Sequence, residues 1–517
     1  MESTALASVT PHHPPATARR AVPRPNPAVV ITALAAAAPI VIYLWIALHR
    51  VGYPFELDWM EGGSVELAGR VLGGHSLYSA PSITFVGWTY PPLYYWLAAG
   101  VAKLTGLGFL PLRLVSLAAS LAAMGILGWM VVKETGNRTA AVVAAGLFAA
   151  TFHITGAWFD TGRVDSLFLA LTLGAIAYGR WARTPRAGIG LGVLAFLAFF
   201  TKQTALLALA PVLLYLVLTR RRVGIPAALT LTALIVASTL ILNATTGGWY
   251  GYYIYAELLH QQVAHTLWLG FWRDDILHQQ WPLLILIAAG GLALAKHKAD
   301  RRTNRRAAVY YLIAAAGLLG SAWASRVHTG GYLNVLMPAY AALALLAGLT
   351  YGALNETKRK TIAAPATAAA VLVQLALLIY PINAQLPTAA DRTAGAQLIA
   401  RLRNLPGRVI VLRHPWYATE AGKGTFAQEE ALGDVLRSTD AKGARPLSAS
   451  LKHALRTDHV QAVVLDGTFD AHFLEPELSR DFRLVPEPIT PRRLYPLTDV
   501  RTSPTLLYLR KNPSPRR

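Results

Sequence analysis

Residues 27–48 read PAVVITALAAAAPIVIYLWIAL, an uncharged run of the length that a helix needs to cross a bilayer. Runs of the same kind recur along the first three quarters of the 517 residues. Hydrophobic residues make up 54% of the chain and charged residues only 15%, a composition typical of proteins embedded in lipid. The sequence therefore predicts a polytopic α-helical membrane protein, with this run as its first span.

Ten further spans are expected from hydropathy, with their ends placed by charge. They lie near 112–132, 138–156, 165–181, 187–200, 203–219, 224–243, 281–296, 307–325, 332–352 and 361–381, which makes about eleven transmembrane helices in all. The runs 187–200 and 203–219 are short, and a re-entrant hairpin is the alternative there. Both flanks of this pair are basic, so the sidedness of later loops is the same in either case.

Basic residues mark every second loop as cytoplasmic. Segments assigned to the inside hold 20 Lys and Arg against four acids, whereas exterior segments before residue 385 hold eight against nine. We therefore expect a cytoplasmic tail at 1–26, a transmembrane domain at 27–384 and a periplasmic or extracellular C-terminal domain, in the inner (plasma) membrane of a bacterium. The net charge of +21 follows largely from this topology and does not indicate a nucleic-acid partner.

Two exterior segments are longer than simple connections need to be. The loop 50–111 contains the apolar run 91–106, which we expect to lie on the outer surface as an interfacial helix, with the aromatic residues 94–96 at headgroup depth. The loop 244–280 is rich in tyrosine and tryptophan. It is expected to form interfacial structure over the site, where its rings would contact membrane lipid or stack on sugars.

The composition changes after the last expected span. Residues 385–517 alternate short β-rich runs with helical patterns, which predicts a small α/β domain outside the membrane. The β-rich runs are 408–413, 461–466 and 505–510, and the helical patterns lie near 426–437 and 448–457. Residues 422–425 read Gly-Lys-Gly-Thr but lack the first glycine of a phosphate-binding loop at the proper spacing, so nucleotide binding is not expected there.

Four acids are concentrated in the first exterior loop: Glu56, Asp58, Glu61 and Glu66. Exposed carboxylates are usually solvated, and we read Glu56 and Glu66 in this way. Asp58 lies between two large apolar residues, one helix end from the bilayer, where partial burial would raise its pKa toward that of a general base. Asp58 is therefore the candidate catalytic carboxylate.

Motifs in this loop and in later exterior segments occur in a characteristic order. They are Asp58-Trp-Met-Glu61-Gly-Gly, Tyr90-Pro-Pro-Leu-Tyr-Tyr-Trp96, Arg113-Leu, Gly162-Arg163-Val-Asp165-Ser-Leu, Phe199-Phe-Thr-Lys202-Gln and Arg326-Val-His328-Thr-Gly-Gly-Tyr-Leu-Asn334. Over residues 28–350 the chain resembles the GT-C glycosyltransferases. The branch that it resembles most is that of the protein O-mannosyltransferases and lipid A aminoarabinose transferases (glycosyltransferase family 39-like). The acid in each early exterior loop is the most specific part of this resemblance.

The resemblance implies transfer of a sugar from a polyprenyl-phosphate-linked donor to an envelope acceptor, which could be a glycan, a lipid or a protein. It implies reaction on the exterior face with inversion at the anomeric carbon, and it implies Asp58 and Asp165 as catalytic acids. Many relatives place two acids side by side, whereas here Glu61 follows Asp58 after a gap. Whether Glu61 assists catalysis, binds a cation or orients the acceptor is left open.

A departing polyprenyl phosphate develops negative charge, which fixed cations stabilise best in a water-poor site. We expect Lys202, Arg326 and His328 to bind this phosphate, because a lysine between two apolar runs is costly unless it is used. An interface anchor is the alternative for Arg326, and a hydrogen-bonded loop histidine is the alternative for His328. Asp165 lies two residues from Arg163 and could form a local pair with it, or it could position a sugar.

No cofactor is assigned from the sequence. The chain has no cysteine, which excludes disulfides, thiol catalysis and iron–sulfur chemistry. His260, His265 and His278 are not spaced to place two ligands on one helix face, so no metal site is assigned, although a divalent cation is left open. A lipid or solute transporter or flippase without transferase activity is the alternative function, but no inverted repeat is evident.

Overall fold

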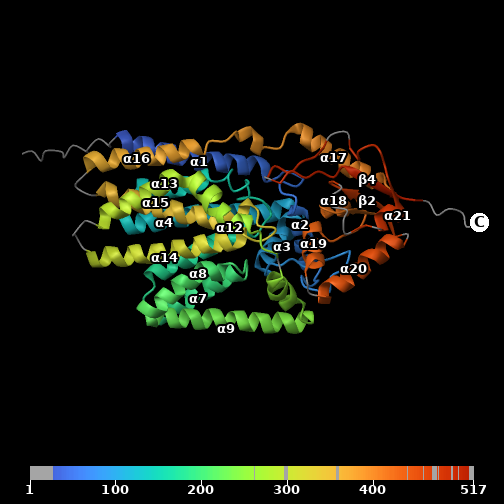
Figure 1. Cartoon of the computed structure of the whole chain (residues 1–517), viewed down its shortest axis with the longest axis horizontal. Coiled ribbons are helices and arrows are strands. Elements are labelled where there is room, and N and C mark those ends of the chain that lie inside the picture. Colours follow the sequence, from blue (N-terminus) through green and yellow to red (C-terminus); the bar gives the residue numbers. More distant parts are fainter. Residues whose placement is uncertain are drawn as a thin grey trace, which may run out of the picture.

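The computed structural model places a bundle of long helices at one end of the molecule and a small mixed domain at the other (Figure 1). The described residues are 27–260, 262–295, 301–356, 360–438, 441–457, 459–467, 474–475, 477–490, 493–498 and 500–511. The predicted cytoplasmic tail at 1–26 lies outside these residues.

Each of the eleven expected spans contains a helix. They are α1 (Pro27–Arg50), α4 (Phe109–Thr135), α5 (Arg138–Ala150), α6 (Asp165–Trp181), α7 (Pro185–Phe199), α8 (Ala205–Thr219), α9 (Arg221–Thr246), α13 (His278–Ala295), α14 (Arg301–Arg326), α15 (Met337–Glu356) and α16 (Lys360–Leu377). Five helical segments of the described chain are long and apolar enough to cross a membrane on their own. The chain is therefore a helical protein with apolar spans, while the number of crossings stays a prediction.

Local sequence explains where several of these helices begin and end. Asn137 caps α5 by accepting a hydrogen bond from the backbone N–H of Ala140 at 3.1 Å, and Thr184 caps α7 directly before the proline at its first position. Gly136 ends α4 in the left-handed conformation, with φ of 68°. Helices α1 and α5 approach closely at Gly146, where an added Cβ would lie 1.9 Å from the carbonyl oxygen of Ala36.

Two short helices belong to the segment 50–111, the predicted first exterior loop: α2 (Glu61–Leu72) and α3 (Leu93–Thr105). The predicted helix near 91–106 is present, and two of its three aromatic rings pack inside the protein, so they are not exposed to a membrane surface. Tyr94 and Tyr95 are buried in the protein, and the hydroxyl of Tyr94 donates to the carbonyl oxygen of Leu112 at 2.9 Å. Only Trp96 is exposed, at 43%.

The second aromatic loop is also largely helical. It contains α10 (Trp249–Gly251), η1 (Tyr252–Ala256), α11 (Glu257–Leu259), α12 (Thr266–Gly270) and η2 (Phe271–Leu277). The tyrosines of η1 pack into the protein, whereas the rings of Trp268 and Trp272 are 47% and 45% exposed. Exposed tryptophans of this kind are typical of a membrane–water interface.

The C-terminal part forms a four-stranded sheet in the order β1-β2-β4-β3. Its strands are β1 (Arg408–Val411), β2 (Val460–Leu465), β3 (Phe482–Leu484) and β4 (Leu506–Arg510), and its helices are α17 (Ala389–Asn404), α18 (Pro415–Glu420), α19 (Glu429–Arg437), α20 (Ala441–Arg456) and α21 (Glu477–Asp481). Strands β1 and β2 are parallel, and β4 is antiparallel to both of its neighbours. The predicted α/β character of this part is present, with β3 as an additional short strand.

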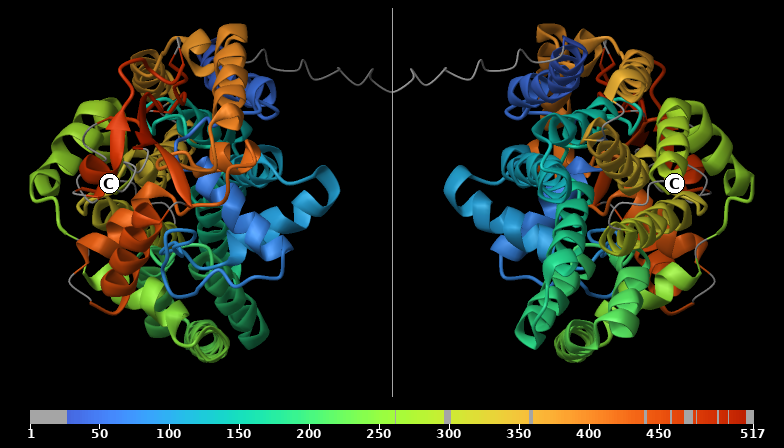
Figure 2. Two further views of the ribbon diagram at one scale, coloured as in Figure 1. Left: turned by 90° about the vertical axis from the view of Figure 1, so that its right-hand side faces the viewer. Right: turned by 90° about the vertical axis from the view of Figure 1, so that its left-hand side faces the viewer.

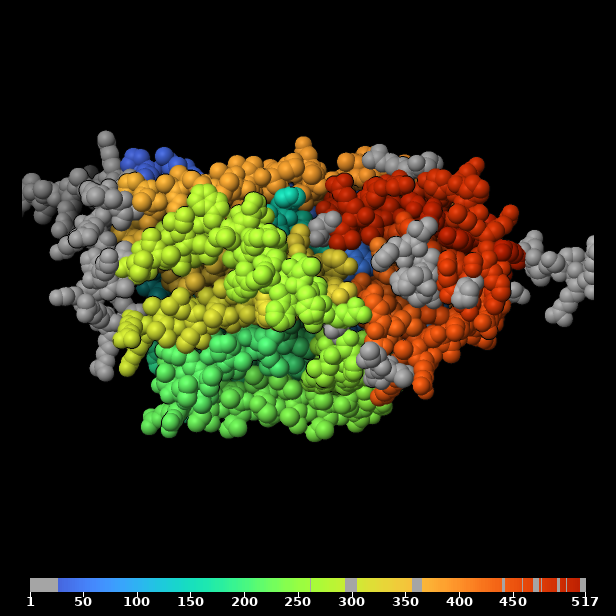
Figure 3. Space-filling view, viewed as in Figure 1, coloured from blue at the N-terminus to red at the C-terminus, as the bar shows by residue number. Residues whose placement is uncertain are grey.

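This domain shares one hydrophobic core with the first exterior loop. Leu57 and Trp59 of the loop belong to the same buried cluster as Leu412 and Leu432 of the domain. Figure 3 shows the domain packed directly against one end of the helix bundle, and Figure 2 views the molecule from that end and from the opposite end. The loop that carries Asp58 is therefore enclosed between the membrane helices and the domain.

Candidate functional site

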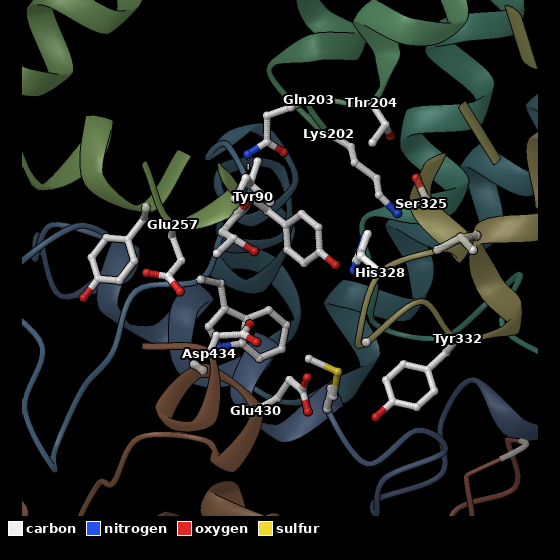
Figure 4. Close-up of a pocket in the computed structure, with 18 of the residues that line it drawn as sticks. Tyr90, Lys202, Gln203, Thr204, Glu257, Ser325, His328, Tyr332, Glu430 and Asp434 are labelled. Carbon is white, nitrogen blue, oxygen red and sulfur yellow. Dashed lines mark hydrogen bonds between the residues drawn. The ribbon is translucent and has the colours of Figure 1, made fainter. Parts of the chain in front are cut away.

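A cavity lies where the helix bundle meets the C-terminal domain (Figure 4). Its cavity volume is about 90 Å³, and about 910 Å³ of space is empty when the solvent at its open mouth is counted. Its walls come from the first exterior loop, the break between α7 and α8, the loop before η3 (Leu333–Leu336), and α19. Lys202 and His328 lie on one side and Glu257, Glu430 and Asp434 on the other (Figure 4), and the cation Arg163 also lines the cavity.

Lys202 and Asp165, both expected at the site, form a direct ion pair. The Nζ atom of Lys202 lies 2.7 Å from Oδ1 of Asp165, and Nδ2 of Asn334 donates to the other carboxylate oxygen at 2.9 Å. The helix is interrupted between α7 and α8, and Lys202 in this break points into the protein. Only 6% of the residue is exposed. The costly position of this lysine is thus stabilised by a partner that begins α6.

Arg163 was not recognised from the sequence as a phosphate-binding candidate. Its side chain is 4% exposed, and neither Nε nor Nη1 has a hydrogen-bond partner. The expected pairing of Arg163 with Asp165 is not its closest contact, because Nη1 lies 3.6 Å from Oδ2 of Asp58. The guanidinium also lies over the ring of Trp158, at 5.1 Å. A buried guanidinium with unused donors beside a cavity is suited to bind an anion.

Asp58 is fully buried and is not among the residues that line the cavity, although Met60, two positions later, is. Its carboxylate accepts from the backbone N–H of Met60 at 3.4 Å, and the hydroxyl of Thr498 lies 3.5 Å from the other oxygen. Burial lowers the pKa of Arg163, but the opposite effect of Asp58, Tyr90 and Asp165 is larger. The pKa of Arg163 therefore lies above its usual range. The charge of Arg163 is therefore shared between the two acids that the sequence had indicated.

Glu61 is occupied by partners that hold the loop in place. Arg113 forms a double contact with it, from Nη2 to Oε2 at 2.6 Å and from Nε to Oε1 at 3.0 Å. The backbone N–H groups of Leu57 and Gly162 also donate to its carboxylate, both within 2.7 Å. Burial raises the pKa of Glu61, but Arg113 and these hydrogen bonds bring it below its usual value. Asp58 precedes the helix that Glu61 begins, so the two acids do not share a helical face.

Of the two predicted phosphate-binding residues Arg326 and His328, only His328 lines the cavity. Arg326 is not among the residues that line the cavity, because its Nε atom is paired with Asp275 at 2.9 Å and Nη1 donates to the carbonyl oxygen of Gly331. His328 lines the cavity, and its Nδ1 is bonded to the carbonyl oxygen of Thr329 at 2.8 Å. Burial lowers the pKa of His328, so the neutral ring presents Nε2 as an acceptor and can donate to a phosphate only when protonated.

The acidic side of the cavity was not foreseen. Burial raises the pKa of both Glu430 and Asp434, which share the nearby cation Arg437. No signal in the sequence distinguishes these two residues from other acids of an amphipathic helix. They enter the site only because the fold places α19 in the wall of the cavity.

The prediction that Glu56 and Glu66 are solvated is wrong. Glu56 is 1% exposed and contacts Nδ1 of His414, while Glu66 is half-buried and accepts from the hydroxyl of Thr419 at 2.9 Å. Both partners lie more than 340 positions away in the sequence. The sequence could not show that the C-terminal domain covers this loop.

The described residues contain no group of three or more His, Asp or Glu side chains placed to hold a metal ion. We therefore assign no metal-binding residues. The loop at 422–425 has a structural contact, since Nζ of Lys423 donates to the carbonyl oxygen of Leu405 at 2.6 Å.

Comparisons of the sequence and of the fold with known proteins identify relatives of this chain. Residues 89–243 match the model of the family described as dolichyl-phosphate-mannose-protein mannosyltransferase. The structure of ArnT from Cupriavidus metallidurans bound to undecaprenyl phosphate superposes with a TM-score of 0.57 at 12% identity, over 93% of this chain and 98% of that one. The chain has the GT-C glycosyltransferase fold. The resemblance that its motifs predicted is confirmed.

Two further structures support this fold. The apo form of the same ArnT gives a TM-score of 0.52 at 15% identity, over 93% of this chain and 98% of that one. The apo oligosaccharyltransferase of Archaeoglobus fulgidus gives 0.50 at 12% identity, over 85% of this chain and 69% of that one. No curated protein matches the chain in sequence.

Proposed function

We propose that the protein is a glycosyltransferase that moves a sugar from a polyprenyl-phosphate-linked donor to an envelope acceptor on the exterior face of the membrane. The observation that carries this proposal is the buried Arg163 guanidinium, whose Nε and Nη1 have no hydrogen-bond partner beside a cavity that Lys202 also lines. A related fold binding undecaprenyl phosphate in ArnT supports the choice of lipid.

The phosphate of the donor would lie on the cationic side of the cavity, between Arg163 and Lys202. Both cations are already preorganised by the acids behind them, at 3.6 Å for Asp58 and 2.7 Å for Asp165. Preorganised charge in a water-poor site stabilises the negative charge that develops as the phosphate departs. His328 would add a donor only in its protonated form.

Asp58 would act as the general base. The acceptor hydroxyl gives its proton to the Asp58 carboxylate while its oxygen bonds to the anomeric carbon from the face opposite the phosphate. The bond from the anomeric carbon to the phosphate oxygen breaks, and its electron pair leaves with the polyprenyl phosphate. One displacement of this kind inverts the configuration at the anomeric carbon.

Asp165, Glu61 and Arg326 would have supporting roles. Asp165 fixes the charged head of Lys202, and Glu61 fixes the chain on both sides of Asp58 through Arg113 and Leu57. Arg326 would order the loop that carries His328, since it bonds to the carbonyl oxygen of Gly331 on that loop.

The test uses full-length protein in vesicles with radiolabelled undecaprenyl-phosphate hexose or pentose and an envelope fraction as acceptor. We expect label to enter the acceptor fraction together with release of undecaprenyl phosphate, and we expect neither with Asp58→Asn. Movement of the intact labelled lipid across the vesicle without transfer would instead establish a transporter.

A further inference from the structure

His414 joins the C-terminal domain to the loop that carries Asp58. It lies beyond the end of β1, directly before α18, and 1% of its side chain is exposed. Its Nδ1 contacts Oε2 of Glu56, and its Nε2 lies 2.9 Å from Oδ2 of Asp466, which follows the parallel strand β2. The ring of Tyr417 stacks on the imidazole at 5.6 Å. One buried imidazole thus bridges two carboxylates from distant parts of the chain.

Both contacts are satisfied together when the imidazole carries two protons, because each ionised carboxylate only accepts. Burial alone would lower the pKa of His414, but Asp466 and Glu56 raise it to about 10. Burial raises the pKa of Glu56 to about 7, with His414 acting in the opposite sense and Glu61 and Asp466 adding to the rise. Glu66 is the remaining acid that acts on this group, through Glu56.

The residues that follow Glu56 are held by the same domain. The backbone N–H of Glu56 donates to the hydroxyl of Tyr417 at 3.1 Å. The carbonyl oxygen of Leu57 accepts from the backbone N–H groups of Leu497 and Thr498, at 3.0 and 3.1 Å. The Thr498 hydroxyl then lies 3.5 Å from Oδ1 of Asp58 itself. Three successive residues up to the candidate base are thus fixed from outside the membrane domain.

We propose that His414 is a positioning residue for Asp58, and that the C-terminal domain completes the active site by clamping the segment 56–58 through His414, Tyr417 and Thr498. The role of Asp58 in this inference rests on the proposed function. The clamp itself is a statement about structure, and it can be tested without turnover.

The first test is backbone amide exchange of the full-length protein in detergent, for wild type and His414→Gln. The NH₂ group of a glutamine can donate to one of the two carboxylates, but its carbonyl oxygen then faces the other. Two acceptors would meet there with no hydrogen bond between them. We expect exchange over residues 55–61 to become at least about tenfold faster, because a buried unsatisfied contact favours local opening. The matched control is His453→Gln, an exposed histidine on α20 of the same domain, which should leave this segment unchanged.

Turnover gives the second readout, with whichever undecaprenyl-phosphate sugar the wild type uses. A displaced base should lower kcat about tenfold to a hundredfold in His414→Gln, with KM for the donor within about twofold, because the phosphate contacts are elsewhere. The double variant Glu56→Gln and His414→Gln forms a neutral hydrogen-bonded pair, so it should recover a large part of the lost kcat. A merely structural role for His414 predicts no such recovery.

The pH dependence follows from the raised pKa of His414. Its stabilising contribution is lost as the pH rises from the ordinary value of 6.5 through about 10, while protonation of Glu56 below about 7 removes one of its two ionised partners. The wild type should therefore lose protection of residues 55–61 as the pH rises through about 10, whereas His414→Gln should show no such alkaline step.

Thr498→Val decides the question if His414→Gln does not fold. This change removes one hydroxyl beside Asp58 at nearly constant volume, and we expect a kcat about threefold to tenfold lower at an unchanged melting temperature. Unchanged exchange over residues 55–61 in His414→Gln, or wild-type kcat in Thr498→Val, would overturn the inference. A wild type that transfers no sugar would refute the proposed function instead, while the exchange result would still stand for the clamp.

Discussion

Glu61 and Arg113 form a bidentate ion pair with no exposure to solvent. The Nη1 and Nη2 atoms of Arg113 also donate to the carbonyl oxygens of Tyr53 and Phe55, at 2.6 and 2.7 Å. Glu61 stands at the start of α2, and Arg113 stands in the first turn and a half of α4. The pair therefore connects two helices and fixes the chain that leads into the first of them. Its consequence is that the position of Asp58 depends on a residue that has no free lone pair for chemistry.

Glu61→Gln should destabilise the protein by about 3 kcal/mol or more, because it leaves the buried charge of Arg113 without its counter-charge. Thermal unfolding of the purified protein in detergent measures this loss. Glu420→Gln is the matched control, since Glu420 is exposed on α18. A melting temperature equal to that of wild type would show that water or another acid compensates Arg113.

Asp58→Asn should abolish turnover while expression and binding of undecaprenyl phosphate stay close to wild type. An amide cannot accept the proton of the acceptor hydroxyl, and a general base acts on the barrier more than on ground-state affinity. Radiolabel transfer and lipid binding are measured on the same preparations. Asp274→Asn, at an exposed ion pair with Arg273, is the control that should remain active.

Activity of Asp58→Asn within about tenfold of wild type would exclude Asp58 as the base. Asp165 would then be the next acid to test. Its carboxylate is bonded to Lys202 and Asn334, so its protonation would have to couple to the phosphate site.

Local signals were sufficient to predict the helices and the first residues of the site. Apolar runs bounded by charge predicted α6 to the residue, with Asp165 at its start, and the structure pairs this acid with Lys202. Lys202 stands out in the same way, because a lysine between two apolar runs is energetically costly without a partner. In each case the physical cause lies within a few residues of the chain.

Contacts between distant segments could not be predicted in this way. Glu56 looks like any loop acid, and its burial comes from His414, 358 positions later. Arg326 looks like a free cation, and only the fold shows that Asp275 occupies it. The exchange of partners that pairs Arg163 with Asp58, and Asp165 with Lys202, is also a property of helix packing.

Gly146→Ala should destabilise the bundle by about 1–3 kcal/mol, because the new Cβ would meet the backbone of α1 and overpacking cannot be relieved by a side-chain rotation. The distance to the carbonyl oxygen of Ala36 would be 1.9 Å. Gly125→Ala is the control, with nothing within 4 Å of its added Cβ. Melting temperatures in detergent compare the two, and equal values would show that α1 and α5 can move apart without cost.

A reporter fused after Arg306 should read cytoplasmic, and one fused after Gln385 should read exterior, as the distribution of basic residues requires. In the fold, α14 begins at the end of the bundle opposite the C-terminal domain (Figure 1). An exterior signal after Arg306 would contradict the sidedness of the site, because the loops that carry Asp58 and His328 would then face the cytoplasm.

Arg163 and Lys202 should act on the same phosphate, and a double-mutant cycle tests this directly. Each single change to alanine should cost on the order of 2–4 kcal/mol at the transition state, by analogy with the loss of one preorganised donor. The double variant should be clearly less than additive, because the first loss already disturbs the geometry on which the second depends. Turnover and affinity for undecaprenyl phosphate are measured at fixed salt.

A second cycle, Lys202→Ala with Arg326→Ala, is the matched control for this coupling. The sequence predicts that these two cations bind one phosphate, but Arg326 is bonded to Asp275 and Gly331 and does not line the cavity. Their effects should therefore add within about 0.5 kcal/mol, as for sites without shared partners. Additivity in the first cycle and coupling in the second would place the phosphate beside Arg326 and would remove Arg163 from the donor site.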